Sequence, residues 1–93
     1  MVIGILQVEV HIPASHTLKE KRAVVKSLKD QIRGRFNVAV AEINSDEKWQ
    51  RATLGLSTIG EGRTYVQGIL RQVSEWLRTT HVVELIRIDE EYM

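Results

Sequence analysis

Residues 2–35 read VIGILQVEVHIPASHTLKEKRAVVKSLKDQIRGR, and this stretch decides the fold. From Leu6 to Ile12 apolar residues alternate with polar ones. A period of two is typical of a strand with one buried face, so we predict a strand over residues 2–12. Pro13 ends it.

The same stretch then changes to the period of a helix. Thr17 and Glu20 have the spacing of a capping box, in which the threonine oxygen accepts from the glutamate backbone N–H and the glutamate reaches back. We predict a helix over residues 18–33, stopped by Gly34 in a left-handed conformation. Its apolar positions fall on one arc of the helix. They are Leu18, Val25, Leu28 and Ile32.

The rest of the chain repeats this alternation of strand and helix. Strands are predicted over 36–43, 51–59 and 81–89, and a second helix over 65–77. The order strand–helix–strand–strand–helix–strand is typical of the α+β ferredoxin-like fold, the split βαβ. Right-handed crossovers place both helices on one face of a four-stranded antiparallel sheet, with the strands in the order fourth, first, third, second. We expect one domain over residues 1–93.

Composition narrows the possible classes of protein. The chain has 93 residues, 43% of them hydrophobic, and no cysteine, which excludes disulfides and thiolate chemistry. The apolar segment from Met1 to Val10 lacks a basic start and is interrupted by Gln7 and Glu9, unlike a signal peptide. No apolar run approaches the roughly 20 residues of a membrane helix. We expect a soluble, cytoplasmic protein.

Positive charge is concentrated in the first helix. Residues 17–35 carry seven basic and two acidic residues, a balance of +5, whereas the rest of the chain carries six basic and ten acidic residues, a balance of −4. Five of the basic residues step by three and four along one side of the helix, and Glu20 and Asp30 are expected outside this stripe. The stripe favours an anionic partner, most plausibly nucleic acid, against the alternative of a solvated helix face. Its members are Lys19, Arg22, Lys26, Lys29 and Arg33.

Several segments resemble a known family. HTLKEKR at 16–22, FNV at 36–38, AE at 41–42 and WQRA at 49–52 are similar to the small bacterial YlxP-like proteins, over nearly the whole chain. The resemblance implies a ferredoxin-like fold. It implies no activity, because that family is a domain of unknown function. The family's genes often lie near translation-initiation and ribosome-maturation genes, an association that points toward RNA or the ribosome.

One face of the predicted sheet is left open by the two helices. Its two central strands carry no outward aromatic residue, which argues against the base-stacking mode of ferredoxin-like RNA binders. Apolar and small side chains on this face favour burial against a second copy, and we expect a homodimer. The residues that we assign to the dimer face are Ile3, Ile5, Ala39 and Ala41.

Polar residues are expected to gather at one edge of this fold. Lys21 and Glu42 each occupy an inward position of their element, and a charge at such a position is expected to be paired, so we predict a structural ion pair between them. The alternative is a small ligand sensor or enzyme with Glu42 or a histidine as acid or base. His11, His16, Asp46 and Trp49 should lie at the same edge.

The histidines with Asp46 could in principle bind a metal, but they lack a tight spacing, and we expect no metal and no cofactor. We find no catalytic signature. The sequence therefore predicts a binding protein without catalytic residues, whose partner is structured RNA or a ribosomal particle. The alternative of another class is a protein–protein interaction module that uses the open sheet face.

Overall fold

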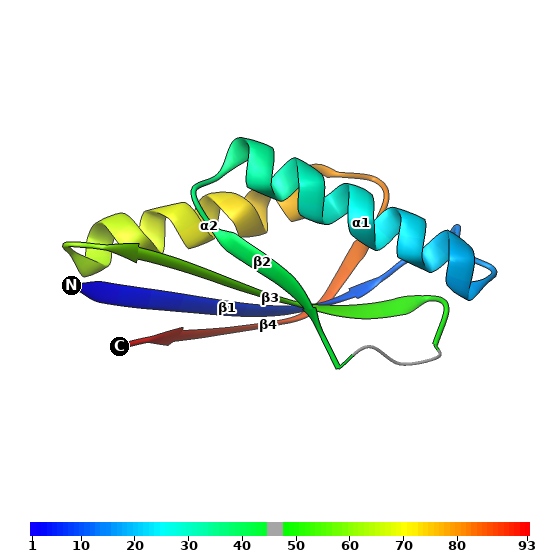
Figure 1. The fold of residues 1–93 in the computed structure, drawn as a ribbon, viewed down its shortest axis with the longest axis horizontal. Helices are drawn as coiled ribbons and strands as arrows, with labels where there is room; N and C mark the ends of the chain where they lie inside the picture. The colour runs from blue at the N-terminus through cyan, green and yellow to red at the C-terminus, as the bar shows by residue number, and fades with distance from the viewer. Residues whose placement is uncertain (45–47) are drawn as a thin grey trace.

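The computed structural model describes residues 1–44 and 48–93. Strands and helices follow one another in the predicted order (Figure 1). They are β1 (Val2–His11), α1 (Leu18–Arg35), β2 (Ala39–Ile43), β3 (Arg51–Gly60), α2 (Arg63–Thr79) and β4 (Glu84–Tyr92).

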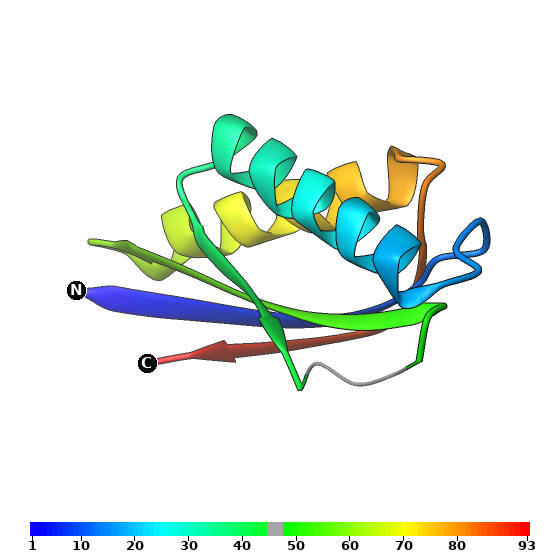
Figure 2. The same cartoon turned by 45° about the vertical axis from the view of Figure 1, so that its right-hand side comes forward.

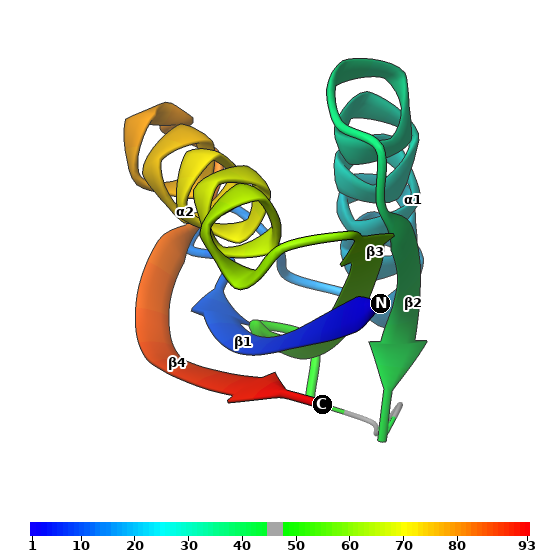
Figure 3. The ribbon, with the colours of Figure 1, turned by 90° about the vertical axis from the view of Figure 1, so that its left-hand side faces the viewer.

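The four strands form one antiparallel sheet in the order β2-β3-β1-β4. Both helices lie on the same face of this sheet, and its other face carries no helix (Figures 1 and 3). This is the ferredoxin-like α+β architecture, so the predicted fold class and strand order are confirmed. β2 and β4 are the two edge strands.

The predicted end of α1 and the predicted start of β2 are wrong. α1 continues through Gly34 to Arg35, and no glycine has a positive φ. The helix ends instead at Phe36, which is extended and donates its backbone N–H to the Ile32 carbonyl at 2.9 Å. Because that N–H closes the helix, β2 begins only at Ala39 and not at Phe36.

β4 begins and ends three residues later than predicted, at Glu84 and Tyr92. Residues 90–92, beyond the predicted end, therefore belong to the strand. The pairing register with β1 shifts between Glu9 and Val10, which face Arg87 and Leu85 respectively. An extra residue at this bulge interrupts the alternation of inward and outward side chains, and the alternation is the signal from which a strand is predicted.

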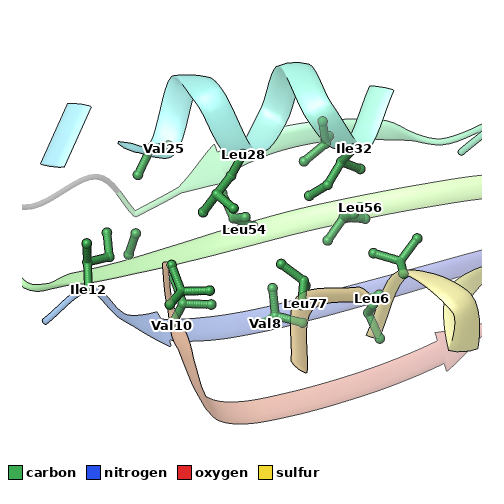
Figure 4. Packing of buried hydrophobic residues seen from close by; sticks show 14 of the residues in the cluster. Leu6, Val8, Val10, Ile12, Val25, Leu28, Ile32, Leu54, Leu56 and Leu77 are labelled. Atoms are coloured by element: carbon green, nitrogen blue, oxygen red, sulfur yellow. The ribbon is translucent and has the colours of Figure 1, made fainter. Parts of the chain in front are cut away.

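The core lies between the sheet and the helices (Figure 4). Alternate residues of β1 and β3 point toward the helices, and α1 and α2 each contribute one apolar side. α2 lies close upon β1, because a Cβ at Gly4 would overlap the side chains of Val66 and Leu70. Central members of the core are Leu6, Val8, Leu28, Ile32, Leu54, Leu56, Leu70 and Leu77.

The two helices stand apart over most of their length (Figure 3). Near the end of α1 the rings of Phe36 and Trp76 meet edge to face, with 6.4 Å between their centroids. The guanidinium of Arg35 lies 5.3 Å from the centre of the Trp76 ring. The side of α1 that carries Arg35 therefore faces α2, and its opposite side is left uncovered.

Candidate nucleic-acid interface and the polar corner beside it

The basic flank, defined as Lys19, Arg22, Lys26, Lys29 and Arg33, lies on the uncovered side of α1. One guanidinium nitrogen of Arg33 donates to the Val40 carbonyl of edge strand β2 at 3.1 Å. Arg35, two residues later, contacts α2 instead. The flank consequently lies beside β2 and away from α2. Lys29 is half-buried and the other four are exposed.

Asp30 belongs to this surface, so the expectation that it lies outside the stripe is wrong. Its carboxylate lies 2.9 Å from Lys26 Nζ and 3.4 Å from Arg33 Nη1. The hydrogen bond and the charge of Lys26 hold the pKa of Asp30 below its ordinary value. The flank with Asp30 therefore carries five positive charges and one negative charge, or +4. Counting only described residues, no carboxylate lies within 4.0 Å of Lys19, Arg22 or Lys29.

The arginines of α2 do not extend the basic flank. The guanidinium of Arg63 stacks on the Tyr92 ring at 4.6 Å. Arg71 and Arg78 line a separate hollow between α2 and β4, together with Glu75 and Glu90. The two groups of cations therefore lie on different sides of the molecule.

Lys21 is the one cation of α1 that points into the protein. Its side chain is 3% exposed, and Nζ donates to the Lys48 carbonyl at 2.9 Å. Glu42 Oε2 lies 3.9 Å from the same nitrogen, and the Glu42 side chain is 18% exposed. The structure thus brings together the two residues that the sequence analysis assigns to an ion pair, at a separation too long for a hydrogen bond.

Glu42 Oε2 is buried and has no hydrogen-bond partner in the part of the chain that the structure describes. It borders a cavity of about 50 Å³ at the point where β2 ends and β3 begins. Glu9 and Arg51, which pair at 3.3 Å across β1 and β3, lie on its wall. We call Glu9, Lys21, Glu42, Lys48 and Arg51 the polar corner.

Trp49 lies beside the polar corner and is 51% exposed. Its two neighbours in the chain are both held in place: the Lys48 carbonyl accepts from Lys21, and Gln50 Nε2 donates to the Ser15 carbonyl at 3.2 Å. The Gln50 carbonyl also accepts from the backbone N–H of Ile12 at 2.8 Å. The indole is therefore presented at the surface by an anchored backbone. Sequence reasoning placed Trp49 at this edge and, because it is a tryptophan in a polar connection, favoured it for an interface.

His11 and His16 contact different partners in the described part of the chain. His11 Nδ1 lies 3.8 Å from Glu84 on β4, and His16 is exposed, with its backbone N–H bonded to the Glu20 carboxylate at 2.7 Å. Asp46, the third proposed ligand, lies outside the described residues. Across residues 1–44 and 48–93 no group of three histidine, aspartate or glutamate side chains is arranged to hold a metal ion.

The open sheet face carries the residues assigned to a dimer. Ile3 and Ile5 are half-buried, and Ala39 and Ala41 are exposed. A shallow hollow of about 300 Å³ spans the middle of this face, lined by Ile5, both alanines and parts of β3. β1 and β3 contain no phenylalanine, tyrosine or tryptophan, so these two central strands lack the aromatic rings on which ferredoxin-like RNA binders stack bases.

Comparison with known proteins bears on the family and the fold. The family described as "Protein of unknown function (DUF503)" matches residues 3–90. The chain belongs to this family. A relative from Bacillus subtilis (strain 168), named "Uncharacterized protein YlxP", is 30% identical over 83 residues, which are 89% of this chain and 90% of the relative. The resemblance to the YlxP-like family is thus confirmed.

A solved structure shares the fold of this DUF503 protein. It is the de novo designed protein Foldit4, with a TM-score of 0.52 and 6% identity, and the match covers 98% of this chain and 96% of that one. At this identity the likeness concerns the fold alone. Neither helix of the described chain is long and apolar enough to cross a membrane.

Proposed function

We propose that this protein binds structured RNA or a ribosomal particle through phosphate contacts made by the basic flank of α1. The observation that carries the proposal is a set of three cations, Lys19, Arg22 and Lys29, that form no ion pair with a described carboxylate and lie on the side of the helix that faces away from α2. Like charges on one helix side repel one another, and an anionic partner relieves that repulsion.

The geometry of the flank suits a backbone of regularly spaced phosphates. Lys19 and Arg33 are 14 residues apart, which is about 21 Å along a helix. Lysine binds phosphate as a point charge on a flexible stem, whereas arginine does so with a planar fork. Such contacts position a protein on nucleic acid without reading its sequence. The partner is therefore defined by its shape and charge.

Charge reversal on the flank tests this proposal. The double variant Lys26→Glu, Lys29→Glu should lose retention on a structured RNA hairpin, measured by filter binding or anisotropy. The matched control is Arg71→Glu, Arg78→Glu, which changes the net charge equally on exposed positions of α2. The control should retain most of the affinity. An equal loss of RNA affinity in both variants would show that binding depends only on the net charge of the protein. Unchanged binding of the Lys26→Glu, Lys29→Glu variant would refute the proposal.

The open sheet face supports a second candidate, a homodimer of this chain. One end of the face is largely apolar, since Ile3 pairs with Ile59, which is 52% exposed, and the charged residue there is Glu91, opposite Ile5. At the other end the charged groups are paired within the chain, Arg51 with Glu9 and Arg87 with Asp89 at 2.9 Å. Internally paired charges do not repel a second copy of the same face.

Light scattering at high protein concentration tests the dimer. Wild-type protein should have the mass of two chains. Ile5→Lys should have the mass of one, because a buried unpaired ammonium is costly. Val82→Lys is the control, since Val82 is also an exposed apolar residue but lies in the turn before β4. A mass of one chain for the wild type would overturn this candidate.

A further inference from the structure

We infer that the polar corner and Trp49 together bind one unpaired nucleobase that carries an exocyclic amino group. This inference rests on the proposed function, because it assumes an RNA partner held by the basic flank. It adds a specific contact to a surface that otherwise meets only phosphates.

The first step is the unsatisfied acceptor. Buried polar atoms in folded proteins are almost always hydrogen-bonded, so a buried carboxylate oxygen without a donor indicates a missing partner. Glu42 Oε2 is such an atom, and Lys21 Nζ at 3.9 Å is too far to donate to it. Its neighbour Glu9 is already paired with Arg51. The group that completes this cavity is therefore a hydrogen-bond donor.

The second step is the size of the space. The cavity beside Glu42 is about 50 Å³, enough for an amino group or a few water molecules but not for a whole base. A wider hollow of about 310 Å³ has two of its lining cations, Lys48 and Arg51, in common with this cavity, and Trp49 and Gln50 complete its lining. In the proposed complex a planar ring occupies the wide hollow and its amino group points toward the narrow one.

The third step is the stacking surface. Unpaired bases are recognised by stacking on an aromatic ring or an arginine plane. Trp49 supplies the ring, and its backbone neighbours are anchored by Lys21 and Ser15. An anchored backbone lowers the conformational cost of binding.

The fourth step is continuity with the basic flank. Lys21 is bonded to Lys48 and precedes Arg22 of the flank in the first turns of α1. The first turns of α1 and the start of β3 lie at the same end of the molecule (Figures 1 and 2). A strand whose phosphates follow the flank therefore reaches Trp49 without crossing the molecule.

Cytosine and uracil form the matched pair of probes. They have the same ring size and charge, but cytosine presents an amino donor where uracil presents a carbonyl, which a carboxylate repels. Oligocytidine and oligouridine of about ten nucleotides are titrated against the full chain by fluorescence anisotropy. Oligocytidine should bind about tenfold more tightly, the ratio expected from one hydrogen bond to a charged acceptor.

Two variants assign that preference to the site. Glu42→Gln keeps the size of the side chain but adds an amide donor that suits uracil, so the ratio of the two affinities should fall to about one. Trp49→Ala should weaken both oligomers about fivefold or more and leave their ratio unchanged, because stacking is tolerant of base identity. Thermal midpoints verify that each variant is folded. Trp49 is exposed, so its truncation should not threaten the fold.

The outcomes separate this inference from the proposed function. Equal affinity of the wild type for both oligomers overturns the inference and assigns the cavity to water. A preference that persists in Glu42→Gln overturns it as well. If Lys26→Glu, Lys29→Glu leaves both affinities unchanged, the proposal for the basic flank fails. The ratio of the wild-type affinities for oligocytidine and oligouridine still decides whether the polar corner prefers cytosine.

Discussion

Two of the ion pairs on α1 differ in length and in environment. Lys26 and Asp30 lie 2.9 Å apart, with side chains 77% and 53% exposed. Lys21 and Glu42 lie 3.9 Å apart, with side chains 3% and 18% exposed. The shorter pair is surrounded by water, which screens its attraction, whereas the longer pair lies in a medium of lower dielectric constant. Distance alone therefore does not rank them.

The difference also separates structure from function on one helix. Lys26 is accessible to a partner in solution, because the Asp30 carboxylate beside it is also exposed and an anionic partner can replace it. Lys21 is committed to the fold, because it holds the Lys48 backbone and faces a buried carboxylate. Variants of the two lysines distinguish these roles.

The largest expected effect is that of Lys21→Met. Glu42 would stay in a buried position without its cation, and breaking such a pair is strongly destabilising. Because Glu42 is partly exposed, we expect a loss at the lower end of that range, about 3 kcal/mol in the free energy of unfolding. Urea denaturation measures it. A loss similar to that of an exposed substitution would mean that the pair does not support the fold.

Adding Glu42→Leu to Lys21→Met should recover at least half of that loss. The double change removes both buried charges and replaces them with apolar side chains of similar length, which is often neutral or stabilising. A double-mutant cycle with Glu42→Leu alone isolates the coupling. Additive losses would show that Lys21 acts through the Lys48 carbonyl only, and that Glu42 has a separate role.

Lys26→Met is the exposed counterpart and should have a much smaller effect on stability. Exposed pairs four residues apart on a helix are weak because water competes for both groups. The same change should weaken binding to an RNA hairpin, since it removes a flank cation. If Lys26→Met destabilises the protein as much as Lys21→Met does, the exposed pair and the buried pair do not differ in their contribution to stability.

The smallest expected effect concerns the pH dependence that Asp30 contributes. Its pKa is lowered in the folded chain by Lys26, from an ordinary value of 3.8, so the unfolded chain binds the proton more readily. This contribution is present above pH 3.8 and is lost as the pH falls through that value toward the lower folded pKa. The stability difference between wild type and Asp30→Asn should therefore shrink on acidification through this window. A difference that grows would reverse the sign of the interaction.

Sequence patterns predicted what depends on local periodicity. The threonine half of the capping box is observed, with Glu20 N–H donating to Thr17 Oγ1 at 3.1 Å, while the Glu20 carboxylate accepts from His16 N–H. The basic stripe occupies one side of a single helix. The Lys21 and Glu42 positions were predicted from their inward phase in two separate elements. Strand order followed from the handedness of the crossovers.

What the sequence did not predict depends on contacts between distant segments. Asp30 was predicted to lie outside the stripe, because the angular positions on a helical wheel take no account of how far a lysine side chain extends. The exposed position of Trp49 depends on the hydrogen bond from Gln50 to the Ser15 carbonyl, and these two residues are 35 positions apart in the chain. The shift in β4 follows from a bulge opposite Glu9, which no pattern within β4 encodes.

The salt dependence of RNA binding tests the central claim most directly. The dissociation constant for a structured RNA hairpin is measured over a series of salt concentrations, for the wild type and for Lys26→Glu, Lys29→Glu. Each phosphate contact contributes a slope of about 0.7 to 0.9, so the three unneutralised cations predict a slope magnitude of roughly two to three in the wild type. A wild-type affinity that does not change with salt would contradict the assignment of the basic flank to RNA.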